Sequence, residues 1–169
     1  MIGASIGSFV LLGIITTFLF LGRSGANIAN YAEMESQARE GLEFFAQDTR
    51  QASELNWNSA QSVSLLVKGV SVTYAFNPTA KTFSRRIGSS PAATLIEGIS
   101  TFTFSGYMIT GGSVDLSDLS TSAKRDNASR VTKQIQIYLK SSRTSTTVTS
   151  ATNTVLSARF ILRNKRVTT

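Results

Sequence analysis

The residues of this chain that could carry catalytic chemistry are few. There is no cysteine and no histidine among its 169 residues. Thiolate and imidazole metal sites, covalent haem attachment and histidine-based triads are therefore excluded. A serine beside a lysine can act as nucleophile and base, but no motif places such a pair here. We therefore expect no catalytic residue, no metal site and no cofactor, and predict that the protein is not an enzyme.

The acidic residues also lack the spacing of a reactive site. Asp115, Asp118 and Asp126 do not match the D-x-D-x-D-G arrangement of a calcium loop, and turn chemistry explains them better. A second group recurs along a predicted helix, where acids on the polar face are usually solvated or ion-paired. This group consists of Glu33, Glu35, Glu40, Glu43 and Asp48.

The N-terminal segment, residues 1–22, has no charge, no proline and no side-chain amide. It is long enough to cross a bilayer core, which takes about 20 residues. A signal peptide is the alternative, but the segment lacks a basic start and a polar cleavage region before Arg23. We predict a membrane or filament-core helix over residues 1–25. The residues expected to pack in this core are Ile2, Gly3, Ile6, Gly7, Phe9, Val10, Leu12, Gly13, Ile14, Phe18, Leu19 and Phe20.

Within this helix, the four-residue spacing of Gly3 and Gly7 would let helix backbones approach closely in lipid, although glycine is common in membrane helices generally. At the end of the apolar run, glycines recur three residues apart, and each weakens a helix by about 1 kcal/mol relative to alanine. We predict a bend or local unwinding at Gly22, Arg23 and Gly25. The alternative is an ordinary helix end followed by a second helix.

Residues 26–55 predict an amphipathic helix that packs on the following domain. Apolar residues recur there at three- and four-residue spacings, including Ile28, Tyr31, Ala38 and Phe45. Residues 56–169 then predict a β-rich head, in which Trp57 fills the junction between helix and sheet. The fold class is therefore α+β: a long N-terminal helix, half apolar and half amphipathic, packed on an antiparallel β-rich head.

Short alternating runs of Val, Thr, Ser and aromatic residues predict the strands of the head. Residues 62–68 and 70–76 form either a strand pair or one bulged strand. Phe102 and Phe104 are expected to face the core, as are Val131, Ile135, Ile137 and Leu139. Loops are predicted over 110–127 and 141–151. The remaining predicted strand segments are 81–87, 93–97, 99–108, 130–140 and 154–163.

Four stretches together carry a family resemblance. They are SFVLLGIITTFLFL, NYAEMESQAREGLEFFAQDTRQA, LIEGISTFTFSGYM and the closing RVTKQIQIYLK with LSARFILRN. This layout resembles the type IV pilin superfamily, in particular the larger minor pilins and the pseudopilins of type II secretion. The resemblance implies a structural subunit held in the inner membrane before assembly. The resemblance also implies that this subunit then assembles, with further copies and other pilin-like subunits, into a helical filament at the cell surface.

One departure concerns the start of the chain. Family members normally follow a short leader ending in glycine with an aromatic residue and, at the fifth mature position, a glutamate. Neither is present here, and the register suggests that Met1 lies a few residues inside a usual pilin start. A leader cut after Gly3, or an unusual pilin, are the alternatives. In the family, that glutamate forms an ion pair with the N-terminus of a neighbouring subunit. No residue of this sequence can be assigned to that role.

Charge is divided unevenly along the chain. Between Glu33 and Glu54 there are six acids and two bases, whereas from Leu55 onward there are four acids and fourteen bases. Acidic stalks could thus pair with the basic heads of neighbouring subunits, which would help to set their register. Alternatively, the head binds DNA or anionic surfaces, or its charge only keeps it soluble. The basic residues concerned are Arg85, Arg86, Lys124, Arg125, Arg163, Lys165 and Arg166.

The side of the membrane on which the head lies is indicated in two ways. Arg23, on the C-terminal side of the apolar run, weakly favours a cytoplasmic head by the positive-inside rule. The resemblance implies an extracytoplasmic head instead. A single arginine followed by acids is slight support, so we adopt the extracytoplasmic placement.

Overall fold

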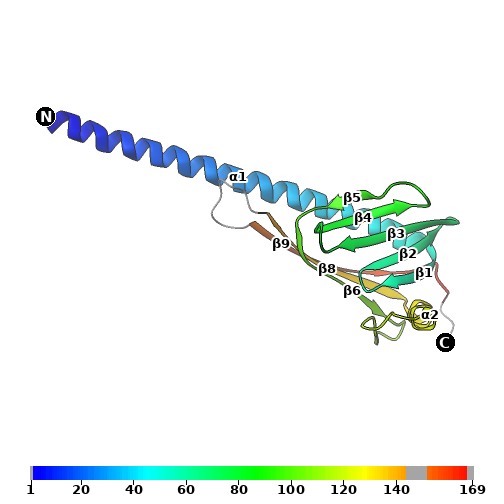
Figure 1. Cartoon of the computed structure of the whole chain (residues 1–169). Helices are drawn as coiled ribbons and strands as arrows, with labels where there is room; N and C mark the ends of the chain where they lie inside the picture. Colours follow the sequence, from blue (N-terminus) through cyan, green and yellow to red (C-terminus); the bar gives the residue numbers. More distant parts are fainter. Residues whose placement is uncertain (1, 144–151, 167–169) are drawn as a thin grey trace.

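The computed structural model describes residues 2–143 and 152–166 and shows one long helix joined to two antiparallel β-sheets (Figure 1). This confirms the predicted α+β layout. Helix α1 spans Ile2–Gln51, and the short helix α2 spans Ser122–Val131. The first sheet has the order β1-β2-β3-β4-β5, with strands Ala52–Ser59, Ser62–Val67, Val70–Asn77, Thr82–Ile87 and Ala93–Ile96. The second has the order β7-β6-β8-β9, with strands Ser113–Val114, Ile99–Tyr107, Gln134–Arg143 and Thr152–Ile161.

The C-terminal half of α1 contributes one face to the core of the head. Met34, Ala38, Phe45 and Thr49 are buried at helical spacing, and the helix contacts β2 and β5 of the first sheet and β9 of the second. Gly41 permits the close approach to β5, because a Cβ there would lie 2.9 Å from Cγ1 of Ile96. The helix is therefore part of the head rather than a tether to it.

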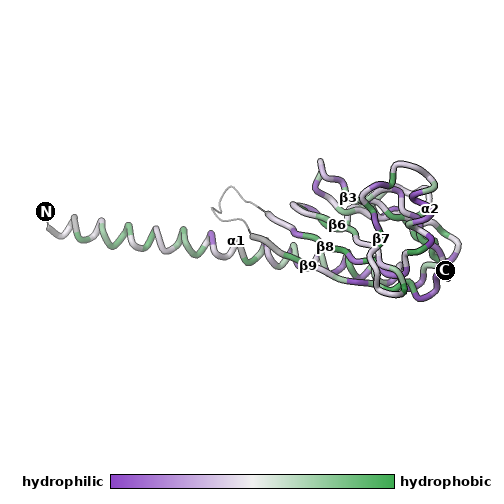
Figure 2. Tube along the Cα trace, turned by 90° about the horizontal axis from the view of Figure 1, so that it is seen from below, coloured by the Kyte–Doolittle hydropathy of each residue, from purple (hydrophilic) through white to green (hydrophobic). Residues whose placement is uncertain are grey.

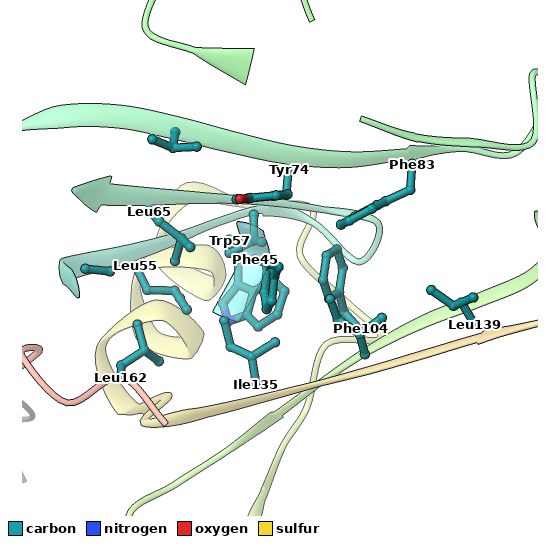
Figure 3. Packing of buried hydrophobic residues seen from close by; sticks show 14 of the residues in the cluster. Phe45, Leu55, Trp57, Leu65, Tyr74, Phe83, Phe104, Ile135, Leu139 and Leu162 are labelled. Atoms are coloured by element: carbon teal, nitrogen blue, oxygen red, sulfur yellow. The ribbon is translucent and has the colours of Figure 1, made fainter. Parts of the chain in front are cut away.

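An aromatic cluster lies between the two sheets and includes Phe45 of α1 (Figure 3). The ring of Phe45 lies 4.9 Å from that of Tyr74 on β3, 6.1 Å from Phe104 on β6 and 5.4 Å from Phe160 on β9, measured between centroids. Trp57 packs edge-on against Phe104. One helical side chain thus contacts both sheets, which makes the head a single packed unit.

A two-residue turn at Lys68 and Gly69 shows that the segments predicted over residues 62–68 and 70–76 are a strand pair and not one bulged strand. Lys68 and Gly69 both have positive φ angles, of 50° and 81°, as a two-residue hairpin turn of the mirror-image type requires. β2 and β3 pair on either side of it without a register shift. Residues 62–67 and 70–77 are therefore two antiparallel strands.

The predicted helix over 26–55 is wrong at its end, because α1 stops at Gln51 and Ala52 begins β1. Ala52 and Leu55 are both buried, and their three-residue spacing fits a helix as well as this bulged strand start. The register of β1 shifts between Ala52 and Glu54, which places both apolar side chains inward. Periodicity alone could not separate these two arrangements.

The predicted loop over 110–127 and strand over 130–140 are also partly wrong. β7 and α2 lie in this region, and β8 begins only at Gln134, so that Val131 ends a helix. The helix begins with a cap in which Thr121 Oγ1 accepts from the backbone N–H of Lys124. Only Ala128 and Ser129 of α2 are buried, so there was no apolar stripe to predict it.

The inward residues of β6 and β8 are largely as predicted. Phe104, Ile135, Ile137 and Leu139 are buried, and Phe102 stacks on Phe76 and Phe83. Strict alternation would have placed Ile99 outward, but a register shift between Ile99 and Thr101 turns it into the core. The predicted loop over 141–151 begins later than expected, because β8 continues to Arg143, and residues 144–151 lie outside the described part.

Candidate functional site

The N-terminal half of α1 extends away from the head and is hydrophobic (Figure 2). Phe9 and Phe18 are 75% and 71% exposed. By length and composition the helix can cross a membrane, and none of its most apolar window is buried. All twelve residues predicted to pack in a filament core lie on this helix, and those whose side chains are described are exposed. So large an apolar surface requires lipid or protein to cover it.

The predicted bend or unwinding at Gly22, Arg23 and Gly25 is not present. The α-helix continues through all three residues, and Figure 1 shows no kink there. The two glycines lower the helix propensity by about 2 kcal/mol relative to alanine, and the helix nevertheless continues through them. The apolar half and the head are therefore joined by one continuous helical rod, of about 75 Å at 1.5 Å per residue.

The predicted stalk acids separate into two kinds. Glu33, Glu40 and Glu43 are exposed, and Glu35 forms an exposed pair with Arg39 at 3.1 Å. Asp48 is different, because it is only 6% exposed and its partner lies in the same chain. The expectation that Asp48 pairs with another subunit is therefore wrong: its position on α1 faces the core.

Asp48 belongs to a polar cluster between α1 and the first sheet. Its Oδ2 atom accepts from Arg85 on β4, at 2.8 Å from Nη2 and 2.9 Å from Nε, and from the hydroxyl of Tyr74 at 2.6 Å. Burial, and then the hydrogen bond to Asp48, raise the pKa of Tyr74 far above its ordinary value. The guanidinium also lies 5.3 Å over the Phe44 ring. This cluster fixes how the helix sits on the sheet.

The predicted basic surface of the head is not a single patch. Arg85 pairs with Asp48, and Lys165 is only 7% exposed, so both are internal rather than available to a ligand. Lys124 pairs with Asp118 and lowers the pKa of that carboxyl, and Arg125 donates to the carbonyl of Leu119. The exposed remainder, on β4 and the C-terminal segment, is Arg86, Arg163 and Arg166.

Lys165 closes the C-terminal end of α2. Its ammonium donates to the carbonyl oxygens of Ser129, of Arg130 at 3.1 Å and of Thr132 at 2.8 Å, which are the acceptors that a helix end leaves unpaired. Trp57 attaches the same helix to β1, because its backbone N–H donates to Ser129 Oγ at 2.8 Å and its ring N–H to Thr132 Oγ1 at 3.1 Å. Trp57 thus fills a junction between α2 and β1, whereas the sequence predicted one between the long N-terminal helix and the sheet.

Lys165 also makes the stability of the head depend on pH. Burial, more than the nearby Lys133 ammonium, lowers its pKa from 10.5 to about 8. Between these values the unfolded chain binds more protons than the folded chain, so we expect the free energy of unfolding to rise with pH across this window. Urea unfolding of the full chain in detergent, at several pH values between about 8 and 10.5, measures this slope. Lys165→Met should remove the slope, and an unchanged slope in that variant would assign it to other groups.

Sequence reasoning missed a group on the outer face of the second sheet. The Arg159 guanidinium lies 3.7 Å from the centroid of the Tyr107 ring and donates to Gln136 Oε1 from Nη2 at 2.9 Å. The Tyr107 hydroxyl donates to the same oxygen at 3.0 Å. Alternation in 134–140 and 155–161 places these residues on one face, but only the register of β6, β8 and β9 brings them together.

Asp115 and Asp118 lie in turns beside a surface hollow of about 480 Å³ between β7 and α2. Each carboxylate accepts from the backbone N–H and hydroxyl of the serine two residues on, which is the turn chemistry that the sequence predicts. For Asp126 that prediction is wrong, because this residue lies within α2. Within residues 2–143 and 152–166, no cluster of three or more acidic side chains is close enough to hold a metal ion.

A search against known protein families gives no match for this chain, and neither does a search of curated proteins.

Proposed function

We propose that this protein is a structural subunit of a type IV pilus-like or pseudopilus filament, assembled through the apolar half of α1 with the β-rich head outside. The observation that carries the proposal is one continuous helix, Ile2–Gln51, with an apolar half that is uncovered and another half that is part of the core of the head. Such a rod fixes the head relative to whatever covers the apolar half, as a helical assembly requires.

A simple membrane anchor explains less of this arrangement. An anchor needs only the apolar run, and a flexible linker to the domain would serve. Here the helix passes the end of that run without interruption. Ile28 and Tyr31 remain exposed between the apolar half and Met34, which is the first buried residue among those whose burial the structure describes. Exposed apolar side chains on this connecting stretch favour contact with further protein.

The alternative of a head that binds DNA or anionic surfaces has less support. Arg85 and Lys165 serve contacts within the chain, and Lys124 is ion-paired. Of the other residues of this predicted surface, Arg86 lies on β4 and Arg163 and Arg166 lie on the C-terminal segment, whereas binding to nucleic acid through phosphates calls for a contiguous basic stripe. We therefore propose the structural role alone.

Electron microscopy of material sheared from the producing cells, with mass spectrometry of the filaments, tests the proposal. We expect helical filaments in which this chain is a main or a regular component. Mass spectrometry of the same material also identifies the first residue of the assembled subunit. If the chain remains monomeric in the membrane fraction and is absent from sheared filaments, the proposal is wrong.

A substitution of Gly7 separates assembly from folding. A Cβ at this position would contact nothing within 4 Å in the single chain, so Gly7→Leu should leave the thermal unfolding of the head unchanged. If helices pack closely at this glycine, the larger side chain should reduce filament yield at least roughly tenfold, and Gly7→Ala should have a smaller effect. Filament counts and melting curves of both variants measure this. A normal yield with Gly7→Leu would exclude close packing there.

A further inference from the structure

The outer face of the second sheet combines an arginine, two tyrosines and exposed apolar side chains, and it has no acid. We define it as Thr101, Thr103, Ser105 and Tyr107 of β6, Gln134, Gln136, Tyr138 and Lys140 of β8, and Val155, Ser157, Arg159 and Ile161 of β9, which the strand register places side by side. None of these residues is acidic. Two are cations, and the apolar side chains of Tyr138, Val155 and Ile161 are exposed. Interface cores are enriched in tyrosine and arginine and depleted in acids.

Arg159 is already held in place on this face. Its guanidinium stacks on Tyr107 at 3.7 Å and donates to Gln136 from two nitrogens, at 2.9 and 3.3 Å. Because the side chain is fixed on folding, less conformational entropy is lost when a carboxylate binds its remaining N–H groups. The face therefore offers a preorganised cation among exposed apolar groups.

The complementary surface lies on the exposed side of α1. Glu33, Glu40 and Glu43 are exposed there, and a hollow of about 460 Å³, lined by Glu43, Ala46, Gln47, Arg50 and Gln51, lies beside them. Arg39 pairs with Glu35, and the other exposed charges on this stretch are three acids, Glu33, Glu40 and Glu43, and one arginine, Arg50. The exposed acids of α1 thus provide negative charge to complement the outer face of the second sheet, which has cations and no acidic residue.

We propose that the outer face of the second sheet of one subunit docks on the exposed acids of α1 of a neighbouring copy; the inference rests on the proposed filament function. Lys140 and Arg159 are about 14 Å apart, four residues along the strands and one strand across. Glu33 and Glu43 are about 15 Å apart along the helix. The two spacings match.

The strands that carry the two cations run alongside the helix that carries the acids, so the two surfaces also have matching directions. β8 and β9 lie along α1 in both views (Figures 1 and 2), and the end of β8 and the start of β9 lie toward the N-terminal half of α1. Phe160 lies beside Phe45, so Arg159 lies near the level of Glu43. Lys140 lies four residues further along the strands toward the N-terminal half, which is about 13 Å or about nine helical residues, and this brings it near the level of Glu33. A side-by-side arrangement of parallel subunits therefore brings each cation to an acid.

Disulfide cross-linking of assembled filaments tests the docking directly. The chain has no cysteine, so only introduced pairs can link. We expect a chain carrying both Glu40→Cys and Ser157→Cys to give a ladder of covalent multimers in filaments, and a chain carrying Glu40→Cys with Thr79→Cys, in the turn between β3 and β4, to give none. If the wild-type chain forms filaments but the chain with Glu40→Cys and Ser157→Cys gives no ladder, the docking is wrong and the proposed filament function is unaffected. A wild-type chain that forms no filaments overturns both.

Charge reversal supplies an independent readout. Arg159→Glu should lower filament yield roughly tenfold, and Glu43→Arg in the same chain should restore it. Lys140→Glu, which leaves the Tyr107 stack intact, should act in the same direction, so that a folding defect in the first variant is not decisive. Arg86→Glu makes the same change on the outer face of the first sheet and should have no effect. An equal loss with Arg86→Glu, or no rescue, overturns the inference.

Discussion

Replacing Phe45 by alanine is expected to lower the free energy of unfolding of the head by about 3 to 5 kcal/mol. Phe45 is fully buried on α1, and its ring contacts Tyr74, Phe104 and Phe160 from both sheets. Its removal leaves a cavity at a point where the helix meets both sheets. Domains are stable by only about 5 to 15 kcal/mol, so much of that stability would be lost. Urea unfolding of the full chain in detergent measures the change.

Phe44 provides the matched control for this substitution. It is the adjacent residue, has the same ring and is only half-buried, beneath the Arg85 guanidinium at 5.3 Å. Phe44→Ala should therefore cost about 1 kcal/mol, mostly the loss of the cation–π contact. If the two alanine variants are destabilised equally, Phe45 does not hold the two sheets together as the structure indicates.

The sequence predicted well those parts of the fold that depend on local pattern. The buried alternation of Ile135, Ile137 and Leu139 and the apolar run of α1 both follow from side-chain periodicity, which a single strand or helix displays by itself. The bulges after Ala52 and Ile99 did not follow, because each one adds a residue that reverses the alternation. Helix α2 was missed because it buries almost nothing.

The candidate surfaces, like the fold, were predicted from the sequence only in part. Charge along the chain predicted an acidic stalk and a basic head, but not which charges remain at the surface. Asp48 and Arg85 are thirty-seven residues apart and meet only after β4 packs on α1, so no local pattern marks them as internal. The outer face of the second sheet likewise depends on the pairing of β6, β8 and β9, and pairing across long separations is not encoded in any single segment.

Replacing Asp48 by asparagine is expected to destabilise the head by about 3 to 5 kcal/mol, since it leaves the Arg85 charge without its partner. The amide has nearly the same shape, so the loss would report charge rather than packing. A carboxylate near the C-terminal end of a helix is also unfavourable to the helix dipole, which indicates that Asp48 is stabilised by the pair and not by its own helix. Urea unfolding of the full chain is the measurement.

Two further variants decide what the pair does. Glu35→Gln makes the same carboxylate-to-amide change in the exposed pair with Arg39 and should cost no more than about 0.5 kcal/mol. Asp48→Leu combined with Arg85→Met and Tyr74→Phe removes every polar member of the cluster, and buried pairs replaced in this way are often neutral or even stabilising. We therefore expect the triple variant to be more stable than Asp48→Asn alone. A triple variant that is less stable would show that the pair itself, rather than the absence of an orphaned charge, stabilises the contact between α1 and the first sheet.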